Sequence, residues 1–307
     1  MPVKQILWIA GLIVFVFSLG YWGKSFLTLQ GSEAQRNSQT VQENPCERRI
    51  VSLAPSITEI LFALERGKDL VGVTRYCNYP PEARAKTKIG GYFDLNFEAV
   101  LELDPTLIIM LTEHVRAREY FHNNGFEILV VNHLTMEGII DSIEIIGEAC
   151  GSKPQAAKMT QRIEAQMEKI LSPIEGKPLK RTMIAVDRSR PRSLEQIYIS
   201  GNDGFFDKMI KLAGGVNVYE GSVPFPAISA EGIIHMDPEI IIELVPEGTL
   251  QNSSVGELIA DWRALTGVKA VENEQVFLLT KDYVSIPGPR FILTLQDIVN
   301  LLHPEGS

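Results

Sequence analysis

The chain has 307 residues, of which 45% are hydrophobic and 22% are charged, and its formal net charge is −9. A chain of this length and composition is typical of a globular protein with about two domains. The negative net charge argues against a general nucleic-acid-binding protein, because such a protein needs a basic surface to release the counterions of the phosphates.

The N-terminal segment is predicted to direct the chain out of the cytoplasm. Residues 6–19 are uncharged and rich in Ile, Val, Leu and Phe. This apolar run lies between the lengths of a signal-peptide core and a membrane-spanning helix. We therefore expect residues 1–29 to be a signal segment or membrane anchor, and Tyr21 and Trp22 favour the anchor. Residues 30–48 follow as a polar linker. The remainder is expected in the periplasm or on the outer face of the cytoplasmic membrane.

Strands and helices alternate through residues 49–151, which we interpret as the first lobe. Strands are expected at 49–54, 70–74, 107–111 and 128–132, and helices at 56–64, 97–103, 114–123 and 136–149. Regular alternation predicts a mainly parallel sheet with helices on both faces.

A long helix is expected over residues 153–171, within a connecting segment at 152–173. The alternation then resumes in a second lobe, residues 174–307. Its strands are expected at 182–186, 240–244 and 276–279, and its helices at 205–212 and 289–302. The predicted fold is α/β, with two Rossmann-like lobes joined by a single long helix. Because a helix resists hinge bending more than flexible strands do, we expect little lobe closure.

An internal repeat supports two lobes of like construction. Residues 97–109 match residues 230–242 without a gap, at a constant offset of 133 (231 − 98). Each copy has a glutamate, apolar residues at helical spacing, an Asp-Pro pair and a β-branched strand. Proline disfavours a helical conformation in the residue before it, so each helix is expected to end at the Asp-Pro pair.

The three cysteines predict one disulfide and one free thiol in an oxidising compartment. Cys46 precedes the first strand and Cys150 ends a helix antiparallel to the strands. Both should lie at the sheet edge away from the carboxyl ends of the strands, so Cys46 and Cys150 are the expected pair. Cys77 is then left as a free thiol. Asn44 and Pro45 do not match a lipoprotein signal, so we do not expect lipidation at Cys46.

Five segments resemble the periplasmic binding proteins whose two lobes are joined by one rigid helix, and within them the cobalamin-binding branch. They are RIVSLAPSITEILFAL (49–64), VGVTRYCNYPPEA (71–83), IGGYFDLNFEAVLELDPTLII (89–109), GGVNV (214–218) and VPFPAISAEGIIHMDPEIII (223–242). The resemblance spans residues 49–302. It implies a binding protein, not an enzyme, that holds cobalamin or a related corrinoid between its lobes and delivers it to an ABC importer. Cobalamin is then the transported ligand, and no cofactor is expected.

The expected ligand site lies at the carboxyl ends of the strands, where open α/β sheets bind ligands. Six residues in the adjoining loops are candidates for ligand contact: Pro55, Tyr76, Tyr92, Phe93, Phe225 and Tyr283. Aromatic rings offer flat apolar contact to a large planar ligand such as a corrin. The alternative is that some of these rings only pack against their own lobe.

The resemblance also implies a role for the glutamates of the repeat. In the family, one glutamate on each lobe faces the permease and meets arginines there, and Glu98 and Glu231 match that motif. Two such carboxylates would orient docking onto a two-fold partner. The alternative is that each only suits the positive end of its helix dipole. The expected partners are a permease dimer and its ATPase subunits, and the chain itself is expected to be a monomer.

The histidines give weaker signals. His114 follows a strand and is a candidate axial ligand for cobalt, but its position is more typical of an exposed loop histidine. The five histidines lack the spacings of a dedicated zinc or manganese site, so no metal site is expected.

Other functions remain open. A ferric siderophore or haem is the alternative ligand, because arginines can bind anionic chelates. The candidate arginines are Arg75, Arg188, Arg190 and Arg192. An enzyme on the same scaffold is a further alternative, although no nucleophile–base pair or phosphate loop is evident. A membrane-tethered sensor is the last, and no output domain supports it.

Overall fold

The computed structural model describes residues 48–188, 193–202, 204–245 and 254–304. Residues 48–307 form one compact unit. The expected signal or anchor segment, residues 1–29, lies outside the described residues. Within the described ranges, no helix is both long enough and apolar enough to span a membrane.

The first lobe contains a five-stranded parallel sheet in the order β3-β2-β1-β4-β5. Its strands are β1 (Ile50–Ser52), β2 (Leu70–Val73), β3 (Thr87–Lys88), β4 (Leu107–Leu111) and β5 (Ile128–Val131). Its helices are α2 (Pro55–Ala63), α3 (Phe97–Glu102), α4 (Val115–Asn123) and α5 (Met136–Ala149), with short 3₁₀ turns at Gly67–Asp69 and Pro81–Ala85.

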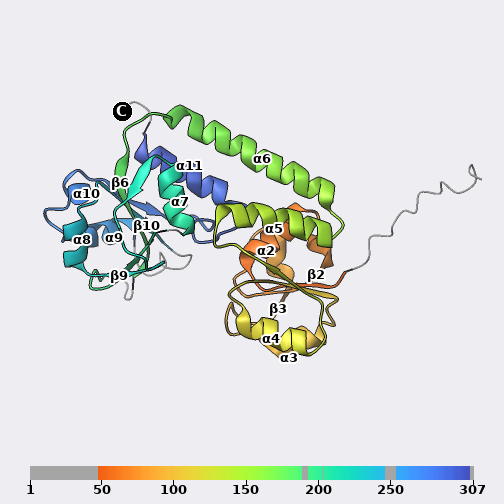
Figure 1. The fold of residues 1–307 in the computed structure, drawn as a ribbon. Coiled ribbons are helices and arrows are strands. Elements are labelled where there is room, and N and C mark those ends of the chain that lie inside the picture. The colour runs from red at the N-terminus through yellow and green to blue at the C-terminus, as the bar shows by residue number, and fades with distance from the viewer. Residues whose placement is uncertain (1–47, 189–192, 203, 246–253, 305–307) are drawn as a thin grey trace, which may run out of the picture. The chain divides into compact units, whose positions relative to one another are not determined.

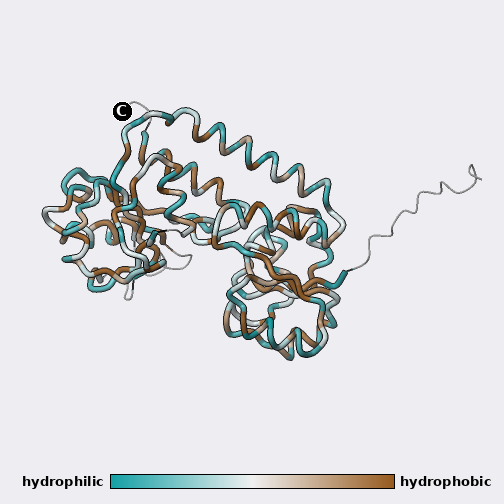
Figure 2. Tube along the Cα trace, in the orientation of Figure 1, coloured by the Kyte–Doolittle hydropathy of each residue, from teal (hydrophilic) through white to brown (hydrophobic). Residues whose placement is uncertain are grey.

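Alternate residues of each strand face opposite layers of this lobe. On β4, Leu107, Ile109 and Leu111 pack with α2 and α5, whereas Ile108 and Met110 pack with α3 and α4. Figure 1 shows these two helix pairs on opposite faces of the sheet. Because both faces are covered, the inner strands are largely apolar, as Figure 2 shows, whereas the edge strand β3 is polar and exposed.

Helix α6 (Lys153–Leu171) joins the lobes and packs against α5 and α11 (Phe291–Leu302). Pro154 lies in the first turn of α6, where backbone N–H groups have no intrahelical acceptor, so the missing N–H of proline costs no hydrogen bond. One hydrophobic core continues from α2 and α5 through α6 to α7 (Phe205–Leu212) and α11. A 3₁₀ turn, Ser172–Ile174, follows α6.

The second lobe contains a six-stranded mixed sheet. Its strands are β6 (Lys180–Arg188), β7 (Ile197–Ile199), β8 (Gly215–Asn217), β9 (Ala227–Ile228), β10 (Ile240–Leu244) and β11 (Val276–Leu279). The order is β11-β10-β6-β7-β9, and β8 also pairs with β6. Strand β7 is antiparallel to both of its neighbours, and the other pairs are parallel. The remaining helices are α8 (Ala230–Met236), α9 (Val255–Trp262) and α10 (Lys269–Glu272).

The predicted fold class is confirmed. The helices expected at 136–149, 153–171 and 205–212 and the strands expected at 107–111, 240–244 and 276–279 have these bounds. The closing helix begins at Phe291 rather than at residue 289. Strands β7 and β9 were not expected, because two or three residues carry too little periodicity to be recognised.

A buried ion pair links the two lobes. Arg290, just before α11, donates from Nε and Nη2 to the two carboxylate oxygens of Glu59 on α2, at 2.9 and 2.7 Å. The same guanidinium donates to Asp282 at 2.9 Å and lies 3.8 Å from the ring centre of Tyr79. Burial raises the pKa of Glu59, and Arg290 opposes this shift. The carboxylate therefore depends on the second lobe for its compensation.

His133 forms a second contact between the lobes. Its Nδ1 lies 2.8 Å from Ser56 Oγ, and the backbone of Pro287 is its other polar neighbour. Gly288 lies so close to Ser56 that a Cβ built on it would be 3.0 Å from the serine Cβ, so a larger residue would require Ser56 to shift by a few tenths of an ångström. Burial lowers the pKa of His133 to about 4.

We expect Arg290→Met to lower the free energy of unfolding by about 3–5 kcal/mol, because it leaves the Glu59 carboxylate buried without its partner. Glu59→Met/Arg290→Met should recover much of this loss, since neither charge then remains. Arg75→Met removes an exposed ion pair and should cost less than about 1 kcal/mol. Urea unfolding at pH 7 measures all three. Equal losses in the single and double variants would show that the ion pair does not carry the effect.

His133 should make stability fall as the pH falls. Its folded pKa of about 4 lies below the unfolded value of 6.5, so the unfolded chain binds the proton first. The contribution is present above pH 6.5 and is lost towards pH 4, up to about 3 kcal/mol. His133→Asn should flatten the pH dependence of urea unfolding between pH 4 and 7. His122→Asn, at an exposed position, should leave it unchanged. Identical profiles for wild type and His133→Asn would refute the assignment.

Candidate functional site

The carboxyl edge of the first sheet collects several of the expected ligand residues. Pro55 is the first residue of α2, directly after β1, and Tyr76 lies in the loop after β2. His114 follows β4 and His133 follows β5. Because these strands are parallel, their carboxyl ends meet at one edge.

Three rings form a cluster at this edge. The Tyr92 and Phe93 ring centres are 4.7 Å apart, edge to face, and the His114 ring centre lies 4.6 Å from Tyr92. Phe93 is 75% exposed, whereas Tyr92 is half-buried and His114 is buried. The cluster borders a cavity of about 300 Å³, which Glu113 and Arg116 also line. An exposed aromatic ring supported by two others offers a preformed apolar wall to a ligand.

The expectation that His114 is exposed is wrong. Its Nδ1 accepts a hydrogen bond from the Leu111 N–H at 3.0 Å, and its ring packs against Tyr92. Burial lowers the pKa of His114, so the imidazole is neutral. The side chain thus closes the end of β4 and supports Tyr92. The backbone N–H occupies the Nδ1 lone pair that a metal would need.

Tyr92 is held as a neutral phenol. Its hydroxyl donates to Glu113 Oε1 at 3.4 Å, and Glu113 also accepts from the Thr112 hydroxyl at 2.8 Å. Burial and then the Glu113 charge raise the pKa of Tyr92. The cavity therefore presents the apolar ring of this tyrosine rather than a phenolate.

Among the described residues, no ring contact joins the other expected ligand aromatics to this cluster. Tyr283 donates to Asp297 at 2.7 Å and lies 5.6 Å from the Arg290 guanidinium, so it belongs to the junction between the lobes. Burial and the Asp297 carboxylate raise the pKa of Tyr283 to about 12. Tyr76 and Phe225 are both exposed, and Phe225 lies in the loop before β9.

The two arginines proposed for an anionic chelate that the structure describes are both paired with carboxylates. The Arg188 side chain is 5% exposed, donates to Glu243 and Asp261 at 2.5 and 3.0 Å, and lies over the Trp262 ring. The structure therefore corrects the expectation that Arg188 binds an anionic chelate in the cleft, because the charge of Arg188 is compensated inside the second lobe. Arg75 pairs with Asp94 at the surface. Arg190 and Arg192 lie outside the described residues.

Cys77 is fully buried and carries a free thiol. The Thr58 and Thr74 hydroxyls lie 3.2 Å from its sulfur, and burial raises its pKa. Cys150 is also buried, at the end of α5, and burial raises its pKa too, against the charges of Arg66 and Arg48. Cys46 lies outside the described residues, so its disulfide with Cys150 stays a prediction.

The two glutamates of the repeat occupy equivalent positions. Glu98 is the second residue of α3, Glu231 is the second residue of α8, and both are exposed. The residue before each helix, Asn96 or Ser229, accepts the N–H three residues later, at 3.1 and 3.3 Å. Both glutamates also lie at the positive end of a helix dipole, which favours a carboxylate there.

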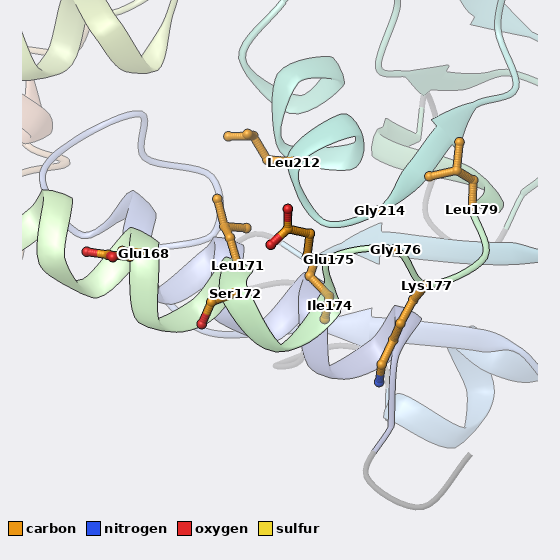
Figure 3. Close-up of a pocket in the computed structure, with 10 residues that line it drawn as sticks. All are labelled: Glu168, Leu171, Ser172, Ile174, Glu175, Gly176, Lys177, Leu179, Leu212 and Gly214. Atoms are coloured by element: carbon orange, nitrogen blue, oxygen red, sulfur yellow. The ribbon is translucent and has the colours of Figure 1, made fainter.

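A hollow of about 500 Å³ lies at the end of α6 (Figure 3). Its lining residues are Glu168, Leu171, Ser172, Ile174, Glu175, Gly176, Lys177, Leu179, Leu212 and Gly214. Strand β6 begins directly after Leu179, so the hollow lies at the amino end of that strand. Parallel sheets bind ligands at the opposite end, and this hollow is not a candidate for the ligand site.

Sequence reasoning missed the residues that hold the site in place. The sequence does not single out Glu59, Tyr79 or Arg290, because an acidic residue within an apolar helix and a tyrosine in a loop have many explanations. The signal that was available is Glu59 itself, a charge on the buried face of α2. A buried carboxylate requires a partner, but the sequence does not name it.

Known proteins that are similar to this chain include the following three. The ABC transporter substrate-binding lipoprotein YvrC of Bacillus subtilis, itself uncharacterised, is 26% identical over 89% of this chain and 85% of its own length. The crystal structure of the periplasmic vitamin B12 binding protein BtuF of Vibrio cholerae is 26% identical, with a TM-score of 0.71, over 83% of this chain and 96% of that one. The periplasmic heme-binding protein RhuT of Roseiflexus is 25% identical, with a TM-score of 0.68, over 83% and 97%.

These likenesses extend over both lobes and the connecting helix. The family model described as periplasmic binding protein matches residues 50–283, which is more than half of the chain. The chain therefore belongs to the periplasmic binding protein family.

Proposed function

We propose that this protein captures cobalamin or a related corrinoid outside the cytoplasm and delivers it to the permease of an ABC importer. Its role as a substrate-binding protein of this class follows from its family and from its likeness to YvrC and BtuF. No cofactor is assigned to the protein, because the corrinoid is cargo. The permease dimer and its ATPase subunits are the partners, and the protein acts as a monomer.

The observation that carries the corrinoid proposal is the cluster of Tyr92, Phe93 and His114. The Phe93 ring is exposed, Tyr92 packs against it, and His114 packs against Tyr92. A corrin is large, flat and mainly apolar on its faces, so a preordered aromatic wall can bind it without ordering long flexible side chains. The exposed Tyr76 and Phe225 are candidates for further contacts from the other loops.

Haem or a ferric siderophore is the second candidate, and the likeness to RhuT favours it. Two features count against it. Arg188 is compensated within its own lobe, and Arg75 is paired with Asp94. A tyrosine that ligates haem iron does so best as a phenolate, whereas Tyr92 has a raised pKa and a carboxylate neighbour.

For transfer, we assign Glu98 and Glu231 to permease docking. Each is an exposed acid at the same position of an equivalent helix, one in each lobe. Basic residues in the two halves of a permease would complement this pair and would orient the encounter.

The first experiment is calorimetric titration of the purified full chain with cobalamin, a ferric hydroxamate and haem in parallel. We expect tight binding of cobalamin. Heat from an iron chelate and none from cobalamin would replace the corrinoid with that chelate and leave the transport role in place.

Phe93→Ala should weaken cobalamin binding about tenfold, because the exposed ring loses its contact with the corrin face. Tyr76→Ala and Phe225→Ala should have effects of similar size. Leu179→Ala is the matched control, since Leu179 is an exposed apolar residue at the amino end of β6. The same titration measures all four variants. A loss with Leu179→Ala and none with Phe93→Ala would overturn the placement of the site.

A further inference from the structure

Helices α3 and α8, which carry the glutamates proposed for docking, each expose an aliphatic side chain beside that glutamate. Leu101 on α3 is 39% exposed, and Ile234 on α8 is 44% exposed. They occupy the same place in the internal repeat, since both pairs of residues are separated by 133 positions (234 − 101 and 231 − 98). Each aliphatic residue follows its glutamate by three residues, which puts the two side chains on the same face of a helix.

The neighbouring positions show that this face is the outward one in both lobes. Val100 on α3 and Ile233 on α8 are fully buried and hold the inner face of each helix against its sheet. A single exposed aliphatic residue needs no explanation. Here the same kind of residue is exposed at matched positions of two lobes, although the residues next to it differ: Glu102 in one lobe and His235 in the other.

Both helices are also fixed at both ends. Asp104 and Asp237 end them in the left-handed conformation, each with φ of 43°. Arg49 donates from Nη2 to the Leu103 carbonyl at 2.6 Å, and Arg181 donates from Nη2 to the Met236 carbonyl at 2.6 Å. These bonds tie α3 to the residue before β1 and α8 to strand β6, and the first turn of each helix is also capped. A surface held in this way loses little conformational entropy on binding.

We propose that Leu101 and Ile234 are apolar anchors of the docking surface, one beside each glutamate. The inference rests on the proposed docking role of Glu98 and Glu231. The partner that fits has two like surfaces, each with a basic side chain next to an apolar pocket, and the two halves of a permease dimer meet this requirement.

The two kinds of residue have different kinetic roles. Exposed carboxylates act at a distance, so they raise the association rate and make it depend on salt. An aliphatic side chain acts only in contact, so it slows dissociation. Acid and anchor can therefore be distinguished by separate rate constants.

The test is surface plasmon resonance of the full chain on its cognate permease–ATPase complex in lipid nanodiscs. Leu101→Gln and Ile234→Gln place a good helix former at both positions. We expect each to raise the dissociation rate about tenfold and the double variant about a hundredfold, with the association rate and the cobalamin affinity unchanged. Ile145→Gln is the matched control, because Ile145 is 44% exposed on α5; it should bind like the wild type.

Glu98→Gln and Glu231→Gln separate this inference from the docking proposal. They should lower the association rate and weaken its salt dependence. If they do so while Leu101→Gln and Ile234→Gln dissociate within twofold of the wild type, the anchors are refuted and the docking glutamates stand. If the glutamate variants bind like the wild type, the docking role and the inference both fall. An equal effect of Ile145→Gln would also overturn the anchors.

Discussion

Glu59 loses almost all of its contact with water when α2 packs on the first sheet, and the group that compensates its charge is Arg290 of the other lobe. Removing one member of such a pair costs more than removing both, because a buried charge without a partner is the least favourable state. The carboxylate is satisfied only while the segment before α11 rests on α2. Together with α6 and the continuous core along it, this contact holds the two lobes as one unit.

The junction also fixes the carboxyl edge of the first sheet. Helix α2 starts at the carboxyl end of β1, so fixing α2 fixes that edge. The close approach of Gly288 to Ser56 and the contact of His133 with the same serine bring the second lobe against the ends of β1 and β5. Tyr283 lies in this network. A junction made of a helix, a core and an ion pair supports the expectation of small lobe closure.

The internal repeat applies to helices α3 and α8 more closely than to the sheets. The first sheet is wholly parallel, whereas the antiparallel β7 makes the second one mixed. The helices α3 and α8 nevertheless share their capping, their left-handed aspartate and an arginine bonded to their last carbonyls. Equivalent surfaces on two lobes of different internal construction suit a partner that is itself two-fold.

By itself, the sequence determined the features that arise within short stretches of chain: α5, α6 and α7, the buried strands β4 and β10, and the repeat with its two glutamates. Helical periodicity, capping residues and proline act over a few residues, so these elements can be recognised locally. Only the tertiary structure decided that His114 packs against Tyr92 and is buried. It also decided that the charge of Arg188 is compensated by Glu243 and Asp261, which are 55 and 73 positions away in the sequence. The same holds for the pairing of Glu59 with Arg290, which are 231 positions apart. The state of a charged or polar side chain depends on its partner and on its loss of water, and both are set by residues that become neighbours only when the chain folds.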